Sequence, residues 1–197
     1  MIIKYGLICE DIAQRSFLEN FLEKQNDVFF QLDQEFYNRF RVAGNNNKQV
    51  IKSIPQIGYQ LVEKYHLDFL FVGLDYDDRN QSDFDKELEQ LYLKIDKNVR
   101  AKSVVFFPVQ AIEHWLLYLK FKIDDPKSTK NVSYENINRK NVKREIFGEG
   151  KNSDYKTKII ISKLTSFDFI DWLKTRSTSF QRFNSDFNNA IQKLKSF

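Results

Sequence analysis

The sequence predicts an α/β fold in which a mainly parallel sheet is covered by helices on both faces. Apolar runs of strand length alternate with segments of helical spacing through residues 1–123. The clearest run is residues 69–74, which is apolar throughout, as expected of a strand buried on both faces. Because 19 Phe accompany only 6 Gly and 3 Pro, the composition is that of a packed globular domain.

The elements expected from this alternation follow in chain order. Strands are predicted at residues 2–9, 68–74 and 103–107, with an extended region of one irregular strand or two short strands at 28–42. Helices are predicted at residues 11–24, 48–65, 82–95 and 111–122. Pro55 is expected to kink or break the second helix, Ser82 to cap the third, and residues 44–47 to form a loop.

The later part of the chain changes in character, which suggests two regions. Residues 1–123 are the predicted α/β core, and residues 124–197 are a predicted polar connection followed by a C-terminal helical extension packed on the core. The extension is expected to hold a short helix capped by Ser166 and a last, longer helix capped by Ser177 or Thr178.

Composition narrows the classes of function. No apolar run reaches the roughly 18 residues of a membrane span, and the start of the chain is too short and too quickly charged for a signal peptide. The single Cys9 excludes an internal disulfide, so we expect a cytoplasmic protein without a membrane partner. The net charge of +4 permits nucleic-acid binding without requiring it. Phe180, Phe183 and Phe187 recur at helical spacing, which favours core packing over stacking on single-stranded bases.

Acidic side chains follow three of the predicted strands. Glu10 follows the first, Asp75 and Asp77 follow the second apolar strand, and Glu113 lies just beyond the third. Because the carboxyl ends of parallel strands share one edge of a sheet, these side chains are expected to converge in one cleft. Clustered carboxylates repel one another unless a cation joins them, so Mg²⁺ or Mn²⁺ is expected there. The alternatives are a solvated turn for the Asp pair, with Asp78 capping it, and helix-dipole partners for the two Glu.

Short motifs across most of the chain resemble those of Toprim domains. Ile8-Cys9-Glu10 followed by a helix resembles the Toprim glutamate motif, and Leu74-Asp75-Tyr76-Asp77 resembles its DxD motif. Residues 109–117 and residues 172–180 are similar to segments of small standalone Toprim-like proteins related to the OLD (overcoming lysogenization defect) nucleases. The resemblance implies a Toprim-like, Rossmann-like sheet.

The resemblance also implies roles for the acidic residues. Glu10 would be a metal ligand or a general acid/base, Asp75 and Asp77 would bind Mg²⁺ or Mn²⁺, and Glu113 would complete the site. A cation is expected beside the scissile phosphate, because it would stabilise the developing charge. The candidates for it are Lys163, Arg176 and Arg182. Of these, Arg176 is preferred, since it adjoins hydroxyls and a predicted helix start.

The activity implied by the resemblance is metal-dependent hydrolysis of nucleic-acid phosphodiester bonds, with DNA favoured over RNA as substrate. Related nucleases act beside an ATPase partner in defence against phage. This chain has no phosphate-binding loop of the G-x-x-x-x-G-K-[ST] type, so any ATPase would be a separate partner protein.

Two positions depart from the family pattern. Asp11 stands where Gly usually follows the glutamate, and Gln14 stands where a second acid is often found. These departures support an alternative, a non-catalytic binding or regulatory module on the same scaffold. A phosphate-receiving domain is a third class, but it fits poorly because Lys102 precedes the third strand rather than following it.

Overall fold

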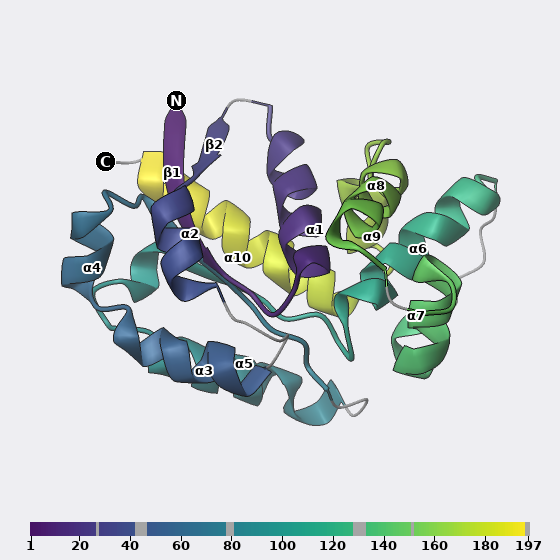
Figure 1. Ribbon diagram of the computed structural model, residues 1–197, viewed down its shortest axis with the longest axis horizontal. Helices are drawn as coiled ribbons and strands as arrows, with labels where there is room; N and C mark the ends of the chain where they lie inside the picture. The colour runs from purple at the N-terminus through teal and green to yellow at the C-terminus, as the bar shows by residue number, and fades with distance from the viewer. Residues whose placement is uncertain (27, 42–46, 78–80, 128–132, 151, 196–197) are drawn as a thin grey trace.

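A four-stranded parallel sheet with the order β2-β1-β3-β4 forms the centre of the molecule (Figure 1). Its strands are β1 (Ile2–Ile8), β2 (Phe29–Leu32), β3 (Phe69–Gly73) and β4 (Ser103–Phe106). The computed structural model describes the whole chain except residues 27, 42–46, 78–80, 128–132, 151 and 196–197. The predicted α/β class is confirmed, because the sheet is parallel and Rossmann-like and helices flank it.

The order of the strands fixes where a cleft can form. From β1 the chain moves outward to β2, and it then returns to place β3 on the other side of β1. The connections after β1 and β3 therefore diverge. In open α/β sheets, ligands bind at the carboxyl ends of two such strands. This point lies between the ends of β1 and β3, directly before Glu10 and Asp75.

One face of the sheet packs against helices from both halves of the chain, α1 (Ile12–Glu23) and α10 (Thr178–Lys195). Four further helices join the same hydrophobic core through contacts with these two helices and with one another: α6 (Ile112–Asp124), α7 (Arg139–Phe147), α8 (Asp154–Leu164) and α9 (Ile170–Lys174). Phe187 of α10 lies against Phe21 of α1, with ring centroids 5.0 Å apart, and against Phe71 of β3 at 6.3 Å. Phe180 and Phe183 are also buried, so the aromatic stripe of α10 is core, as its spacing predicted.

The other face is covered by shorter helices from the first half. They are α2 (Gln34–Phe40), α3 (Asn47–Ser53), α4 (Tyr59–Lys64) and α5 (Phe84–Lys94). Four 3-10 turns complete the described secondary structure: η1 (Ile54–Gln56), η2 (Gln81–Asp83), η3 (Arg100–Lys102) and η4 (Tyr134–Asn136). Ile8, Leu70 and Val72 point to this side of the sheet and form its core with residues of these helices.

Several predicted elements differ from the structure, each for a local reason. The extended region expected at 28–42 ends at Leu32, because the Asp33 carboxylate accepts a hydrogen bond from the Phe36 N–H (2.7 Å) and starts α2. The helix expected at 48–65 is broken into α3, η1 and α4 around Pro55, as the proline predicted. Of the predicted loop 44–47, residues 44–46 lie outside the described residues, and Asn47 begins α3.

Some of the predicted helix starts differ from those in the structure. The residue that caps α5 is Asp83 rather than Ser82, which lies in η2. The helix expected to start at Ser166 begins only at Ile170. Ser177 caps α10 as predicted, since its hydroxyl accepts a hydrogen bond from the Phe180 N–H (3.1 Å). The polar connection 124–157 contains a helix of its own, α7.

No helix in the described ranges is both long and apolar enough to cross a membrane.

Candidate functional site

The predicted acidic residues meet at the carboxyl edge of the sheet. Glu10 follows β1, Asp75 follows β3, and Glu113 lies in the first turn of α6, after β4. All three side chains are buried, although each has an ionisable carboxyl group. The structure therefore brings together the residues that the strand ends predicted, and it removes them from water.

Asp75 is the centre of this group, with only 3% of its surface exposed. Its Oδ1 accepts hydrogen bonds from Gln14 Nε2 (2.8 Å) and from the Ile112 N–H (3.3 Å). Its Oδ2 forms an ion pair with the Arg139 guanidinium at 2.5 Å. Its backbone N–H donates to Glu10 Oε1 at 2.6 Å. Asp75 therefore links β3 to the starts of α1, α6 and α7.

Gln14 joins the two acidic strand ends. Its Oε1 accepts a hydrogen bond from the Glu10 N–H (3.0 Å) while its Nε2 donates to Asp75. Gln14 is fully buried on α1, which Asp11 caps by accepting from the N–H groups of residues 13 and 14. Gly73 makes room for it, since a side chain there would lie 2.8 Å from Gln14 Oε1 and closer still to Phe106. An amide can donate and accept at once, which a carboxylate here could not do.

Asp77 shares a cation with Asp75. The Arg139 guanidinium reaches Asp77 Oδ1 at 2.7 Å with one nitrogen and Asp75 with the other. Asn47 supports the same turn by donating from Nδ2 to the Asp75 carbonyl (2.9 Å) and to Asp77 Oδ2 (3.1 Å). Asp75 and Asp77, which the sequence predicts to bind Mg²⁺ or Mn²⁺, share a guanidinium of the chain itself. Asp78 lies outside the described residues.

Glu113 approaches the group from α6. Its Oε1 lies 3.3 Å from Lys143 Nζ, while its Oε2 is buried and has no hydrogen-bond partner within the described part of the chain. Only 2% of Glu113 is exposed. A buried carboxylate oxygen without a donor carries a desolvation cost, so this atom is available to a proton or a cation.

The loop that precedes Glu113 is held in place by the turn that carries Asp75 and Asp77. Tyr76 forms a parallel bridge with Val109, and the Tyr76 carbonyl accepts from the Gln110 N–H at 2.6 Å. Gln110 has a φ of 61°, in the left-handed region that few non-glycine residues adopt. The side-chain amide of Gln110 also donates to the Glu135 carbonyl. Such strained, well-tethered turns are typical of functional sites.

Burial raises the pKa values of two carboxyl groups in this site. Burial raises the pKa of Glu10 to about 6, against the opposing effect of the Asp75 N–H that bonds its carboxylate. Burial, and then the charge of Glu10, raise the pKa of Asp75 well above its usual range, although Arg139 lowers it. The cationic charge supplied by Arg139 therefore does not compensate fully for the desolvation of these carboxylates.

The carboxylate oxygens of this group are of a type that suits a divalent metal, but their present arrangement is not that of a metal site. Carboxylate oxygens are the ligands that Mg²⁺ and Mn²⁺ prefer, and the partnerless Glu113 Oε2 and the raised pKa values indicate a deficit of positive charge. Among the described residues, however, no three acidic, His or Cys side chains are arranged to hold a metal. In this arrangement Asp75 and Asp77 share the guanidinium of Arg139 instead.

The predicted phosphate-binding cations lie elsewhere. Arg176 stacks on the Trp172 ring at 4.2 Å and lines a pocket of about 290 Å³ with Glu135 and Ser177. Arg182 forms ion pairs with Asp85 and Asp186. Lys163 is exposed on α8. Arg176 and Arg182 thus contact residues outside the acidic group, and Lys163 faces solvent.

Sequence reasoning missed Arg139, Asn47 and Lys143. Arg139 and Lys143 lie in the polar connection, where the only signal was Asn138. The Asn138 side chain caps α7 by accepting from the Lys140 N–H at 2.9 Å. An Asn ahead of a basic helix of nine residues could have predicted α7, but not its approach to Asp75.

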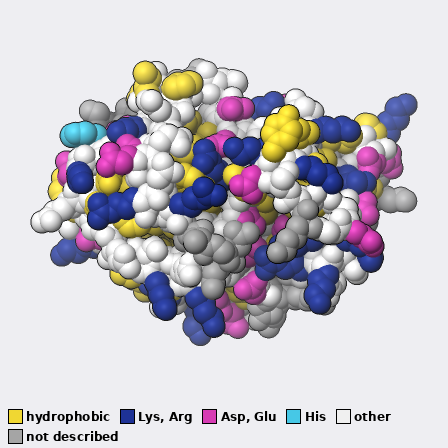
Figure 2. Space-filling view, in the orientation of Figure 1, with side chains coloured by type: hydrophobic (Ala, Val, Ile, Leu, Met, Phe, Trp, Pro, Cys, Tyr) yellow, Lys and Arg dark blue, Asp and Glu magenta, His cyan; other side chains and the backbone are white. Residues whose placement is uncertain are grey.

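Two open pockets share residues with the acidic group. One, of about 510 Å³, is lined by Asp75 and Asp77 together with Asn47, Gln90 and Lys94. The other, of about 660 Å³, is lined by Glu113 and Asp11 together with basic residues of α7. On the face seen in Figure 2, acidic and basic side chains are intermixed rather than segregated. Both pockets border buried carboxylates, and the Asp77 side chain, which is 65% exposed, is the member of the group that faces solvent.

No family model, no curated protein and no solved structure matches this chain.

Proposed function

We propose that this protein is a Mg²⁺- or Mn²⁺-dependent nuclease that hydrolyses phosphodiester bonds of nucleic acid. The supporting observation is the convergence of the buried Glu10, Asp75 and Glu113 at the strand ends where α/β sheets place their sites, with the pKa values of Glu10 and Asp75 raised by burial. Structural ion-pair networks also bury carboxylates. The buried Glu113 Oε2, which has no hydrogen-bond partner among the described residues, favours a site that takes a further ligand.

In this proposal each residue has a distinct task. Asp75, Asp77 and Glu113 would hold the metal, which would polarise the phosphodiester and activate water. Glu10 engages the Asp75 N–H through Oε1, so Oε2 can hold or release a proton, and its pKa of about 6 suits exchange near neutral pH. Gln14 would keep Glu10 and Asp75 at a fixed separation.

Arg139 has two tasks in sequence. It neutralises Asp75 and Asp77 in the metal-free protein. Once displaced, a guanidinium tethered at the edge of the site is suited to a phosphate oxygen, because it offers paired N–H donors. Arg139 thus takes the role that the sequence assigned to Arg176. DNA rather than RNA as substrate, an ATPase partner and a role in phage defence belong to the same proposal.

The test is cleavage of supercoiled plasmid, single-stranded DNA and RNA with Mg²⁺ or Mn²⁺. We expect the wild type to cut at least one substrate and EDTA to stop it. Asp75→Asn should reduce the rate by about a hundredfold or more, since it removes a charge at the centre of the site. Glu89→Gln, an exposed carboxylate on α5, is the matched control. Equal metal-dependent rates for wild type and Asp75→Asn would refute the assignment.

A second function, a non-catalytic binding module, is favoured by one observation. Asp75 and Asp77 already have a cation in Arg139, and Gln14 replaces an acid that a second metal would need. This reading predicts that metals neither bind nor support turnover, whatever residue stands at position 139.

A further inference from the structure

The two edge strands of the sheet, β4 and β2, differ in whether their outward backbone groups have hydrogen-bond partners among the described residues. At the β4 edge, the Val105 N–H, which faces away from β3, donates to the Tyr92 hydroxyl (3.2 Å). That hydroxyl in turn donates to Asp186 of α10 at 3.2 Å. Helices α5 and α10 therefore close this edge with side-chain hydrogen bonds, which is one way that proteins prevent strand addition.

The β2 edge has no such closure in the described part of the chain. The N–H groups of Phe29 and Asp33 donate inward to β1, at 3.0 Å to the Met1 carbonyl and 2.9 Å to the Tyr5 carbonyl. Since alternate residues of a strand direct their backbone groups to opposite sides, Phe30 and Leu32 direct theirs outward. The strand reads Phe-Phe-Gln-Leu, without the Lys or Pro that commonly protects an edge. Among the described residues, the short length of β2 is the feature that limits strand addition.

Apolar side chains are exposed beside this open edge. Ile2 and Phe29 are 67% and 66% exposed, and they are paired neighbours on one face of the sheet. Figure 2 shows hydrophobic side chains at the surface at the top of the molecule, where Figure 1 places the start of β1. An adjacent pair of this kind, joined by Met1, forms a patch rather than an isolated exposed residue.

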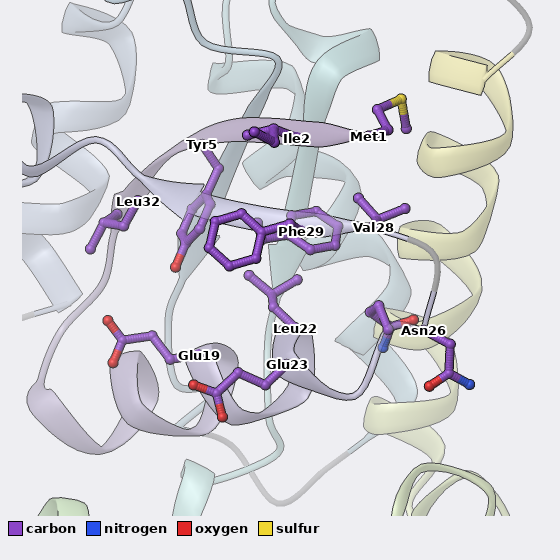
Figure 3. Close-up of a pocket in the computed structure, with 12 residues that line it drawn as sticks. Met1, Ile2, Tyr5, Glu19, Leu22, Glu23, Asn26, Val28, Phe29 and Leu32 are labelled. Carbon is purple, nitrogen blue, oxygen red and sulfur yellow. The ribbon is translucent and has the colours of Figure 1, made fainter.

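This patch continues into a pocket of about 760 Å³ between β2 and α1, whose lining includes Ile2 and Phe29 (Figure 3). Tyr5 and Leu22 belong to its apolar lining, and Glu19 and Glu23 lie on its α1 side. No Lys or Arg lines it. Glu19 is paired with Arg15 at 2.7 Å, whereas Glu23 has no ion pair among the described residues. The pocket therefore combines an apolar lining with a negative rim.

We propose that β2 binds an extended segment of a partner protein in which Lys or Arg alternates with apolar residues. The segment adds to the sheet as a fifth strand through the outward backbone groups of Phe30 and Leu32. Apolar side chains of the added strand cover the patch at Ile2 and Phe29, and a Lys or Arg that enters the adjoining pocket meets Glu23.

Charge favours such a partner over a second copy of this chain. Two β2 strands pairing antiparallel are related by a two-fold axis normal to the sheet. Such an axis keeps both α1 helices on the same face, so Glu19 and Glu23 of each copy would approach those of the other. Like charges placed across paired strands are destabilising.

The test uses synthetic seven-residue peptides and the full chain. One peptide alternates Val with Lys, a second alternates Val with Glu, and a third is the Val-Lys peptide N-methylated on the residues whose N–H groups face β2. Amide exchange at Phe30 and Leu32 is followed by NMR. At a peptide concentration ten times Kd, the Val-Lys peptide should slow exchange at both amides by about tenfold. The methylated peptide should have no effect.

Reversing the charge of Glu23 tests whether charge contributes to peptide binding. Glu23→Lys should weaken the Val-Lys peptide by about twofold to fivefold and strengthen the Val-Glu peptide, with Glu63→Lys on α4 as the matched control. The proposal is overturned if no peptide protects Phe30 and Leu32 at millimolar concentration, or if the methylated peptide binds equally well. It is also overturned if the chain itself dimerises in sedimentation and Phe29→Lys, but not Leu93→Lys, abolishes the dimer.

Discussion

At the scale of single residues, the main feature of the acidic group is the pairing of Arg139 with Asp75 and Asp77. Arg139 contacts Asp75 at 2.5 Å and Asp77 at 2.7 Å, and it comes from a helix more than sixty residues further along the chain. A metal bound as proposed would therefore compete with Arg139 for the same carboxylate oxygens.

This competition gives the first prediction. Arg139→Gln should tighten Mn²⁺ binding by about tenfold or more, because the metal no longer has to displace a charge-assisted pair. Calorimetric titration of Mn²⁺ into wild type and variant measures the change, and Arg144→Gln, exposed on the same helix, is the control. Equal affinities would contradict the competition while leaving the nuclease proposal intact. No Mn²⁺ binding by either protein would favour the binding module.

The second prediction concerns Glu10 and pH. Burial raises its pKa to about 6 in the folded protein, from an ordinary value of 4.5, so between these values the folded state binds more protons than the unfolded state. By linkage, this group lowers the stability as pH rises through that window. Glu10→Gln keeps an oxygen for the Asp75 N–H but cannot ionise. Relative to Glu10→Gln, wild type should lose stability between pH 4.5 and 6 in urea unfolding with EDTA present. Parallel pH profiles would count against the raised pKa.

At the scale of elements, capping and edge contacts explain where the sequence pattern was correct and where it was not. The strands β1, β3 and β4 and the helices α1 and α6 follow their apolar periodicity closely, because each buries one continuous stripe or run. Helix α2 replaced an expected strand because aromatic and branched residues suit either state, and the Asp33 cap decided between them.

The closed edge of β4 provides a prediction at this scale. Tyr92→Phe removes the hydroxyl that accepts from the Val105 N–H, and Val105 is buried. A buried N–H without an acceptor costs about 1–3 kcal/mol, so the free energy of unfolding should fall by about that amount. Denaturant unfolding measures it, and Tyr59→Phe, on the exposed surface of α4, should leave it unchanged. A Tyr92→Phe protein as stable as wild type would show that another group closes the edge.

At the scale of the whole molecule, the core joins the first strands to the last helix. Phe187 of α10 packs on Phe21, Phe30 and Phe71, which come from α1, β2 and β3. The C-terminal helix therefore shares one hydrophobic cluster with the first half of the sheet. A cluster shared in this way should make the chain unfold as one cooperative unit.

Phe187→Ala tests this cooperativity. It should lower the free energy of unfolding by about 3–5 kcal/mol, the cost of a cavity left by a buried Phe. The transition should remain single when followed by both far-ultraviolet circular dichroism and Trp fluorescence. Phe29→Ala, at an exposed position, should change stability by no more than about 0.5 kcal/mol. Two separate transitions would show that α10 folds apart from the sheet.

Some residues of the candidate site could be predicted from the sequence, and others could not. Glu10, Asp75 and Glu113 could be predicted to converge, because parallel strands carry their carboxyl ends to one edge. Gln14 could be identified as a departure from an acid, but its bridge between Glu10 and Asp75 depends on the close approach of β3 that Gly73 permits. Arg139 could not be chosen among the many cations, because nothing local marks its partner.

The sequence by itself determined the alternation of strands and helices, the buried character of β3 and the acids at the strand ends. These features depend on side-chain periodicity and on neighbours a few residues away. Only the tertiary structure decided that Arg139 pairs with Asp75 and Asp77 and that β4 is closed while β2 stays open among the described residues. Charge pairing and edge protection act through space between segments far apart in the chain, so their partners are set by how the helices pack around the sheet.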